Sequence, residues 1–276
     1  MSLSPPVVHP HRANVPVLIS VPHAGRDYPD WLLELSKGGR GSLNALEDPL
    51  VDDLAAPAIE AGIGAIVARA PRAAIDCNRA EDEIDPTVVR SGPLAAVSAR
   101  ARGGLGIVPG RTATHGPLWR QPIHYRELED RLDQAHRPYH RAIDEQLARL
   151  LDEFGCALLL DCHSMPAPDS GPEIIIGDRY GQSAAPWVTS EAVKIVTSTG
   201  FRAGVNQPFA GGHVVQRHGA SHNGVHALQI EIDRRCYLTN EGVPGPGFAR
   251  TSRLIHQLAF RLGQFLLDRR FAQAAE

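Results

Sequence analysis

The sequence predicts an α/β fold: a single domain over residues 1–276, with a mixed, mostly parallel sheet and helices on both of its faces. Apolar strand-like runs alternate along the chain with segments of helical period, and this alternation is typical of parallel sheets covered by helices. The 276 residues have 43% hydrophobic content, which is sufficient for one large core or for two modest ones, and we expect one domain. Polar residues gather where several apolar runs end, as expected for a site at one edge of the sheet.

The predicted strands are short runs rich in Val, Ile, Leu and Ala, as expected for strands buried on both faces. In chain order they are Val17–Val21, Gly64–Ala70, Ala74–Asp76, Ala157–Asp161, Glu173–Ile176 and Val225–Ile232. The first predicted helix has Asp48 at the N-cap and Pro49 at the first helical position. The second is long, with a kink expected at Pro138. The predicted helices are Asp48–Ala61, Leu118–Phe154, Pro186–Ser198 and Phe248–Ala274.

Residues 80–116 interrupt this order. The segment is acidic first, then rich in Arg, Gly, Ala and Ser, and shows no sustained period. A loop of this length inside a compact domain is usually a lid, a binding loop or a disordered segment. We therefore expect residues 80–116 to form a long lid-like or partly disordered loop.

The charge balance narrows the class of partner. A formal net charge of -3, from 28 Lys and Arg against 31 Asp and Glu, gives no large field of either sign. This argues against a nucleic-acid or anionic-membrane surface and favours a small-molecule partner. No segment reaches the roughly 20 apolar residues that a membrane crossing needs, so we expect a cytoplasmic protein. The four cysteines show no CxxC spacing and are interpreted as small buried hydrophobic residues.

Histidines at the ends of two predicted strands indicate a metal site. His163 follows the apolar run before Asp161, and His23 follows Pro22, which stops the first strand. For either histidine alone, a hydrogen-bonded residue at the rim of the core is the simpler interpretation. Both together favour one transition metal, because neutral imidazole is a good ligand for such ions. Cys162 would face the opposite side of the strand from His163, so the two would not bind one ion together.

Other polar residues have the chemistry to bind a substrate. Asn78 and Arg79 offer donors that match a carboxylate, although a surface pair between Arg79 and Asp76 is an equally good interpretation. Gly212 precedes His213 and permits close backbone approach to a ligand, or simply a bend.

Glu231 is a further candidate functional residue. Alternation from Val225 places Ala227, Gln229 and Glu231 on one face of a strand. A carboxylate facing the interior of a sheet is costly unless a metal, a cation or a substrate compensates it. With the histidines and the Asn78–Arg79 pair, Glu231 would suffice for metal-assisted hydrolysis, in which a glutamate takes a proton from water and delivers it to the leaving amine.

Several segments resemble, in the same order, the motifs of the N-formylglutamate amidohydrolase family. The resemblance spans about Val15 to Leu238 and includes VPHAGRDYP, AIDCNRAED, LLLDCHSMP, NQPFAGGHVVQRHG and HALQIEIDRRCYL. It implies a mixed α/β sheet and a mononuclear zinc site, as in the distantly related zinc carboxypeptidases and aspartoacylases. It also implies cleavage of the formyl amide of N-formyl-L-glutamate to formate and L-glutamate, a step of histidine degradation.

The resemblance also implies roles for individual residues. His23 and His163 would bind Zn²⁺, with another divalent ion as an alternative. Arg79, with Asn78, would hold the substrate carboxylate or the developing oxyanion. Glu231 would be the general base, and His213, with Gly212, would line the substrate pocket.

The third metal ligand does not follow the pattern of the zinc carboxypeptidases. Zinc carboxypeptidases place a Glu three residues after the first His, whereas this chain has Arg26 there, which cannot bind a cation. The acidic stretch Leu46–Asp52 resembles a family motif, and we choose Asp48 over Asp52. A helix N-cap is the competing role for Asp48.

Two other functions remain open from the sequence. One keeps the chemistry and changes the substrate to another N-acyl amino acid or a related small amide. The other is a non-catalytic small-molecule binder, which would have no need for an in-strand carboxylate such as Glu231. The sequence does not indicate the oligomeric state.

Overall fold

The computed structural model describes residues 2–93, 97–166 and 170–274, and their contacts divide the chain into two compact units. Unit 1 comprises residues 1–7, 22–47 and 67–141, and unit 2 comprises residues 8–21, 48–66 and 142–276. Each unit is therefore assembled from stretches that are distant in the sequence. Within the described residues, no helix combines the length and the apolar character that a membrane crossing needs.

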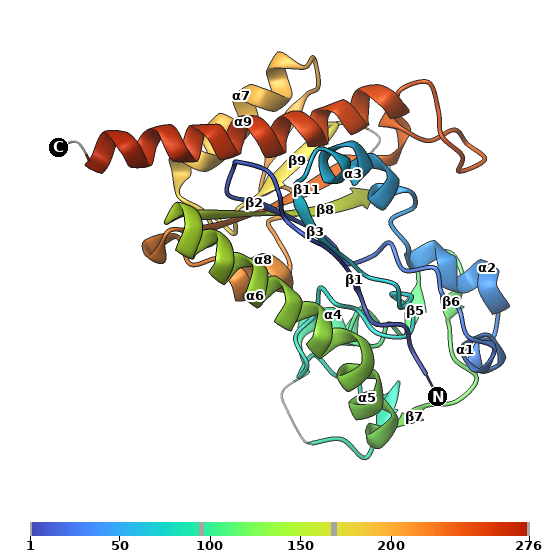
Figure 1. Cartoon of the computed structure of the whole chain (residues 1–276). Helices are drawn as coiled ribbons and strands as arrows, with labels where there is room; N and C mark the ends of the chain where they lie inside the picture. The colour runs from blue at the N-terminus through green and yellow to red at the C-terminus, as the bar shows by residue number, and fades with distance from the viewer. Residues whose placement is uncertain (1, 94–96, 167–169, 275–276) are drawn as a thin grey trace. The chain divides into compact units, whose positions relative to one another are not determined.

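Unit 2 is built on the main sheet (Figure 1). Among the described residues this sheet has seven strands, in the order β1-β3-β2-β8-β11-β9-β10. β2 pairs parallel with β8, β8 parallel with β11, and β9 parallel with β10, while β9 runs antiparallel to β11. The strands are β1 (Val7–His9), β2 (Val17–Val21), β3 (Gly64–Val67), β8 (Ala157–Met165), β9 (Ile174–Gly177), β10 (Ala203–Val205) and β11 (Val225–Asp233).

Helices of unit 2 cover both faces of the sheet, which confirms the predicted α/β class (Figure 1). On one face α9 packs on β2, α3 and α7, and a side chain at Gly263 of α9 would meet Val15 and Val17. On the other face α8 contacts β11 and β8, and its His218 bonds Asp144 of α6 at 2.8 Å. The helices are α3 (Val51–Glu60), α6 (Arg137–Phe154), α7 (Pro186–Ser198), α8 (His213–His218) and α9 (Phe248–Ala274).

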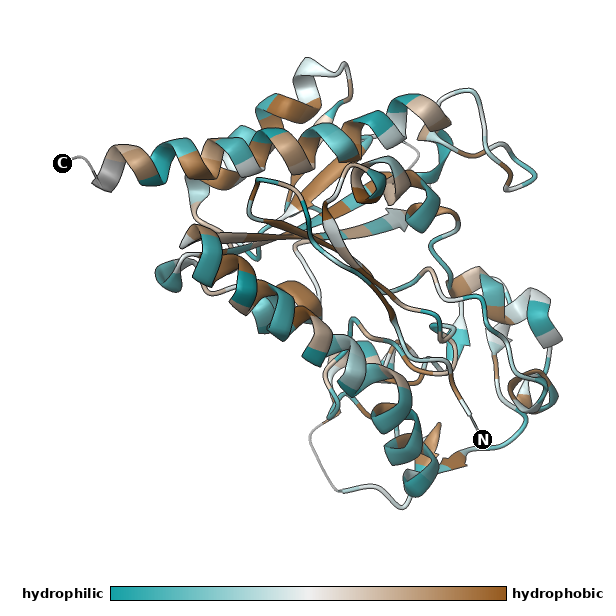
Figure 2. Ribbon diagram, viewed as in Figure 1, coloured by the Kyte–Doolittle hydropathy of each residue, from teal (hydrophilic) through white to brown (hydrophobic). Residues whose placement is uncertain are grey.

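Unit 1 has less regular structure around its own apolar core. Buried residues such as Leu32, Ile75 and Leu118 form this core, and Figure 2 shows the apolar residues of the chain in brown. The elements are α1 (Asp30–Leu35), α2 (Gly39–Leu43), β4 (Val89–Arg90), α4 (Ala99–Arg102), β5 (Arg111–Thr112), β6 (Gly116–Pro117), β7 (Ile123–His124) and α5 (Tyr125–Arg131).

Most predicted strands are present, with three corrections. β3 ends at Val67 and does not reach the predicted end at Ala70. β8 continues to Met165, so His163 lies inside the strand and not beyond its end. The reason is that β11 pairs with β8 along its full length, up to the pair Asp233 and Met165. The strand predicted at Ala74–Asp76 is wrong, because the backbone N–H groups of residues 74 and 75 donate to Pro71 O and form a turn.

The predicted helices at residues 186–198 and 248–274 are confirmed, and the other two differ in detail. α3 begins at Val51 with Leu50 before it in the left-handed region at φ 60°, so Asp48 is not its N-cap and Pro49 lies outside it. The long helical segment begins at Tyr125, and a π-helical turn at Leu132–His136 separates α5 from α6. This turn precedes Pro138, which lacks the N–H that a regular helix would use there.

The segment 80–116 contains the short elements β4, α4 and β5, and its residues 94–96 lie outside the described residues. Ile107 and Val108 are buried in the core of unit 1, and Ile107 O accepts a hydrogen bond from the N–H of Asp76 at 2.8 Å. Part of this segment is therefore packed structure, and its role as a lid stays a prediction.

Candidate active site

Unit 2 carries a polar array on the face of the sheet that α8 contacts. In the register of β8 and β11, Glu231 pairs with His163, and Gln229 pairs with Asp161. Paired residues of neighbouring parallel strands point to the same face, with the strands about 4.8 Å apart. The array therefore consists of Asp161, His163, Gln229 and Glu231, all buried, as the alternation predicted for Gln229 and Glu231.

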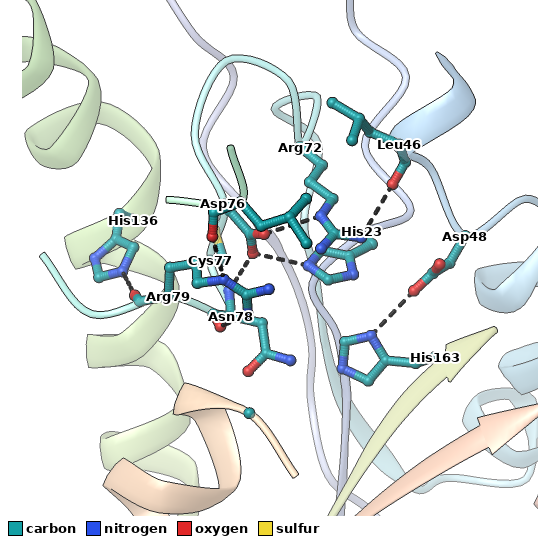
Figure 3. A network of polar contacts seen from close by, with 12 residues as sticks. His23, Leu46, Asp48, Arg72, Asp76, Cys77, Asn78, Arg79, His136 and His163 are labelled. Carbon is teal, nitrogen blue, oxygen red and sulfur yellow. Dashed lines mark hydrogen bonds and ion pairs between the residues drawn. The ribbon is translucent and has the colours of Figure 1, made fainter. Parts of the chain in front are cut away.

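His163 is held by a carboxylate at each ring nitrogen. Its Nε2 lies 2.8 Å from Oδ2 of Asp161, two residues earlier on the same face of β8. Its Nδ1 lies 3.0 Å from Oδ2 of Asp48 (Figure 3). A histidine that binds a metal usually donates its other ring N–H to a carboxylate, and Asp161 is placed for that task. The Nδ1 atom and Asp48 are then the pair that faces a cation.

Asp48 is a buried carboxylate with several donors around it. Its Oδ1 atom lies 3.4 Å from Nη2 of Arg234 and accepts a hydrogen bond from Ser164 at 3.5 Å. The N-cap position of α3 is Leu50, and no side chain caps this helix, so Asp48 is not its N-cap. Asp48 and His163 thus offer two ligand atoms from unit 2.

The electrostatics of the array favour a cation. Burial by itself lowers the pKa of the His163 imidazole, but the charge of Asp161 and the hydrogen bonds to Asp161 and Asp48 outweigh burial. The pKa of His163 therefore lies well above its usual value, with a further contribution from Glu231. Several buried carboxylates gathered on one imidazole stabilise either a proton or a metal ion there.

Gln229 connects Glu231 to the start of α8. The Nε2 atom of Gln229 donates to Oε1 of Glu231 at 2.8 Å, and its Oε1 accepts from the backbone N–H of Gly212 at 2.7 Å. Gly212 directly precedes His213, the first residue of α8. The structure therefore brings two predicted site segments of unit 2, one containing Glu231 and the other Gly212 and His213, onto one hydrogen-bond chain.

In unit 1 the predicted site residues surround Asp76. The Oδ1 atom of Asp76 lies 2.8 Å from Nε2 of His23 and also accepts the backbone N–H of Asn78 at 2.8 Å (Figure 3). The Oδ2 atom accepts from Nε of Arg72 at 2.9 Å. Burial by itself raises the pKa of Asp76, but the charges of Arg72 and His23 outweigh burial and hold this pKa well below its usual range. Asp76 is therefore an anion that orients His23 as Asp161 orients His163.

Arg79 is buried, which corrects the alternative of a surface Arg–Asp pair. Its Nε donates to Leu105 O at 2.8 Å, and its Nη1 donates to Asn78 O at 2.7 Å. The Arg79 carbonyl is 2.9 Å from Nε2 of His136. Burial lowers the pKa of Arg79 but leaves a guanidinium whose position is fixed by backbone carbonyls. Such a fixed fork can bind a carboxylate or a developing oxyanion.

Several contributing residues have no predicted role. Asp161 and Gln229 could have been found by their two-residue spacing from His163 and Glu231, which places each pair on one strand face. Arg234 contacts Asp48 from the end of β11. Arg72 and the central role of Asp76 have no comparable signal, because their positions depend on a turn that the sequence pattern does not indicate.

Comparison with known proteins identifies similar sequences over most of the chain. The model of a protein family described as N-formylglutamate amidohydrolase matches residues 15–238. N-formylglutamate deformylase from Pseudomonas putida is 30% identical over 247 residues, which cover 83% of this chain and 84% of that protein. The enzyme of the same name from Pseudomonas aeruginosa is 30% identical over 245 residues, which cover 83% and 85%.

A solved structure is similar along nearly the whole chain. It is the N-formylglutamate amidohydrolase from Ralstonia eutropha JMP134, which superposes with a TM-score of 0.87 at 26% sequence identity. The superposition covers 96% of this chain and 99% of that one. Together with the sequence matches, this similarity confirms the resemblance that the motifs predicted.

Proposed function

The chain belongs to the N-formylglutamate amidohydrolase family, and from this premise we propose that it hydrolyses the formyl amide of N-formyl-L-glutamate to formate and L-glutamate. Two curated relatives that it matches over 83% of its length are named for this substrate. The partner is accordingly a small molecule, and a cytoplasmic location is part of the proposal. Another N-acyl amino acid remains the alternative substrate.

One observation supports metal-dependent hydrolysis: each candidate histidine ligand is held by its own buried aspartate. Asp76 binds Nε2 of His23, and Asp161 binds Nε2 of His163. This pairing of carboxylate and histidine is typical of metal ligands, because it fixes the tautomer and leaves the other nitrogen for the ion. Two such pairs in one chain favour metal binding over two ordinary core histidines.

The proposed ligands of the ion are His23, Asp48 and His163. β2 lies next to β8 in the sheet, and His23 follows the end of β2 at Val21 by two residues. The covalent chain therefore keeps the Cα of His23 within about 7 Å of that of Val21. Two imidazoles and a carboxylate suit Zn²⁺, which in catalytic sites has three protein ligands and one open position.

The residues of the chain then have distinct tasks. When bound, Zn²⁺ supplies a Lewis acid and lowers the pKa of a water molecule to about 7. Glu231 takes the proton of the attacking water at its carboxylate and passes it to the amide nitrogen that leaves. Arg79, with Asn78 beside it, holds a substrate carboxylate or the developing oxyanion.

The substrate and the base are tested together. Purified protein is assayed for amine release on N-formyl and N-acetyl forms of glutamate, aspartate, glutamine and leucine, with N-formyl-L-glutamate expected to have the highest kcat/KM. Glu231→Gln should keep its metal and fold and lose about 10²- to 10⁴-fold in kcat. No turnover of any substrate by metal-loaded wild-type protein would favour a binder, and wild-type turnover by Glu231→Gln would refute the proposed base.

The third ligand is tested by a matched pair of variants. Asp48→Asn removes the charge next to His163, whereas Asp52→Asn makes the same change in the first turn of α3. Elemental analysis after dialysis should find zinc in wild type and in Asp52→Asn, and little in Asp48→Asn. The reverse result would assign the ligand to Asp52.

A further inference from the structure

The side chain of Gln229 makes hydrogen bonds in two directions. Its carbonyl oxygen accepts from the N–H of Gly212 at 2.7 Å, and its amide nitrogen donates to Glu231 at 2.8 Å. Gln229 is buried on β11, two residues before Glu231 and on the same face. A buried amide with this placement links the backbone before α8 to the carboxylate.

The chemistry of the neighbours fixes the orientation of this amide. A backbone N–H such as that of Gly212 can only donate, and an ionised carboxylate such as that of Glu231 can only accept. The oxygen of Gln229 must therefore face Gly212, and the nitrogen must face Glu231. Apolar side chains of the same length provide neither bond.

The local backbone allows Gln229 to reach this far. Gly177 of β9 is opposite Gln229 in the antiparallel register, and a Cβ there would lie 2.7 Å from the carbonyl carbon of Ala210. The loop before α8 therefore lies directly against β9. Gly211 in this loop has φ +123°, a conformation that side-chain-bearing residues rarely adopt. The loop thus holds the N–H of Gly212 at a defined place over the sheet.

We propose that Gln229 is a positioning residue for the hydrolytic reaction. It fixes the carboxylate of Glu231 with its N–H group, and it sets the position of Gly212 and of His213 relative to that carboxylate. The inference rests on the proposed function, because it takes Glu231 as the general base. A displacement of about 1 Å of a catalytic group can cost about 10²-fold in rate, so one hydrogen bond is sufficient to matter.

The test is a double-mutant cycle with Gln229→Met and Glu231→Gln, measured as kcat and KM for N-formyl-L-glutamate at high enzyme concentration. Gln229→Met should lower kcat about 10- to 100-fold when Glu231 is present. In the Glu231→Gln background the same change should have almost no effect on kcat, because there is no base left to position. Gln229→Asn, which is too short to make both bonds, serves as a second variant in case Gln229→Met does not fold.

The matched control is Ser183→Ala. Ser183 is buried, and its hydroxyl donates to Ala227 O on β11, the strand of Gln229, at 2.8 Å. Replacing Ser183 by Ala therefore removes a hydrogen bond to β11 without changing the contacts of Gln229. This variant should lose stability and keep the kcat of wild type. If Gln229→Met lowered kcat equally in the wild-type and Glu231→Gln backgrounds, the inference would be overturned, while the role of Glu231 as general base would stand. Wild-type turnover by Glu231→Gln alone would instead overturn the proposed function.

Discussion

The two polar clusters of this chain are held in place in different ways. On β8 and β11 the register of two paired strands brings His163 beside Glu231, and regular backbone sets the direction of both side chains. Around Asp76 the backbone is irregular, and a single buried carboxylate holds His23 and Arg72. The strand array therefore depends on the sheet, and the loop cluster depends on one charged residue.

This difference has a consequence for stability. Removing one side chain from the strand array leaves the backbone hydrogen bonds of β8 and β11 intact. Removing the charge of Asp76 breaks its ion pair with the partly buried Arg72 and weakens the hydrogen bond that Asp76 accepts from the N–H of Asn78. The loop cluster should therefore be the more fragile of the two.

The largest expected effect compares Asp76→Asn with Asp161→Asn, two isosteric changes that each remove one buried charge. Asp76→Asn should lower the free energy of unfolding by about 3 to 5 kcal/mol, the range for breaking a buried ion pair. Asp161→Asn should cost less, about 1 to 3 kcal/mol, because the His163 imidazole keeps a second carboxylate, Asp48, at its Nδ1 atom.

Urea denaturation of both variants in the presence of a chelator gives these free energies without a contribution from bound metal. If the two variants lost equal free energy of unfolding, the loop cluster would be no more fragile than the strand array.

The same distinction explains what could be predicted from the sequence. Strand periodicity was sufficient to place Gln229 and Glu231 on one face, since side chains alternate along a strand. It was not sufficient to find that β8 extends through His163, because that extension depends on pairing with the whole of β11. Around Asp76 the pattern predicted a strand, whereas the structure has a turn closed on Pro71.

The candidate metal ligands could also be predicted only in part. The positions at the ends of two predicted strands, and then the family motifs, gave His23 and His163 as candidate ligands, but the aspartate that holds each ring is known only from the structure. Asp48 lies before a helix in the sequence, where a cap is the usual role. Only the backbone conformation at Leu50 separates it from α3.

Arg79→Lys tests the loop cluster at the level of function. Arg79 uses Nε and Nη1 for the carbonyls of Leu105 and Asn78, and a single ammonium group cannot reproduce this fixed fork. We expect kcat/KM for N-formyl-L-glutamate to fall about 10- to 100-fold, which corresponds to about 1.4 to 2.8 kcal/mol and is of the size expected for one charge-assisted hydrogen bond.

The role of Arg79 is resolved by comparing the loss of kcat/KM in Arg79→Lys for N-formyl-L-glutamate with the loss for its amide analogues. A loss confined to the carboxylate substrate would support recognition of that carboxylate. Equal losses on all substrates would point to an oxyanion role. An unchanged kcat/KM would show that the fork does not contact the substrate.

The smallest expected effect concerns His226, a histidine on β11 outside the polar array. Its Nδ1 accepts the N–H of Ala185 at 3.3 Å, and burial lowers its pKa to about 4. Because the unfolded chain binds this proton near pH 6.5, it holds more protons than the folded chain between about pH 6.5 and pH 4. Stability therefore falls as the pH is lowered through this window, by about 1 to 2 kcal/mol once partial solvent screening is allowed for.

His226→Asn keeps an acceptor near the position of Nδ1 for the N–H of Ala185 and removes the titration. Its free energy of unfolding, measured by urea denaturation at several pH values, should decline less than that of wild type between pH 6.5 and pH 4.5, while activity at pH 7.5 stays unchanged. Burial alone lowers the pKa of His226, whereas His163 is flanked by two aspartates. Histidine is therefore kept neutral at position 226 and favours a bound cation at position 163. An identical pH dependence in wild type and variant would show that His226 does not contribute, and the contrast between the two histidines would then rest on geometry alone.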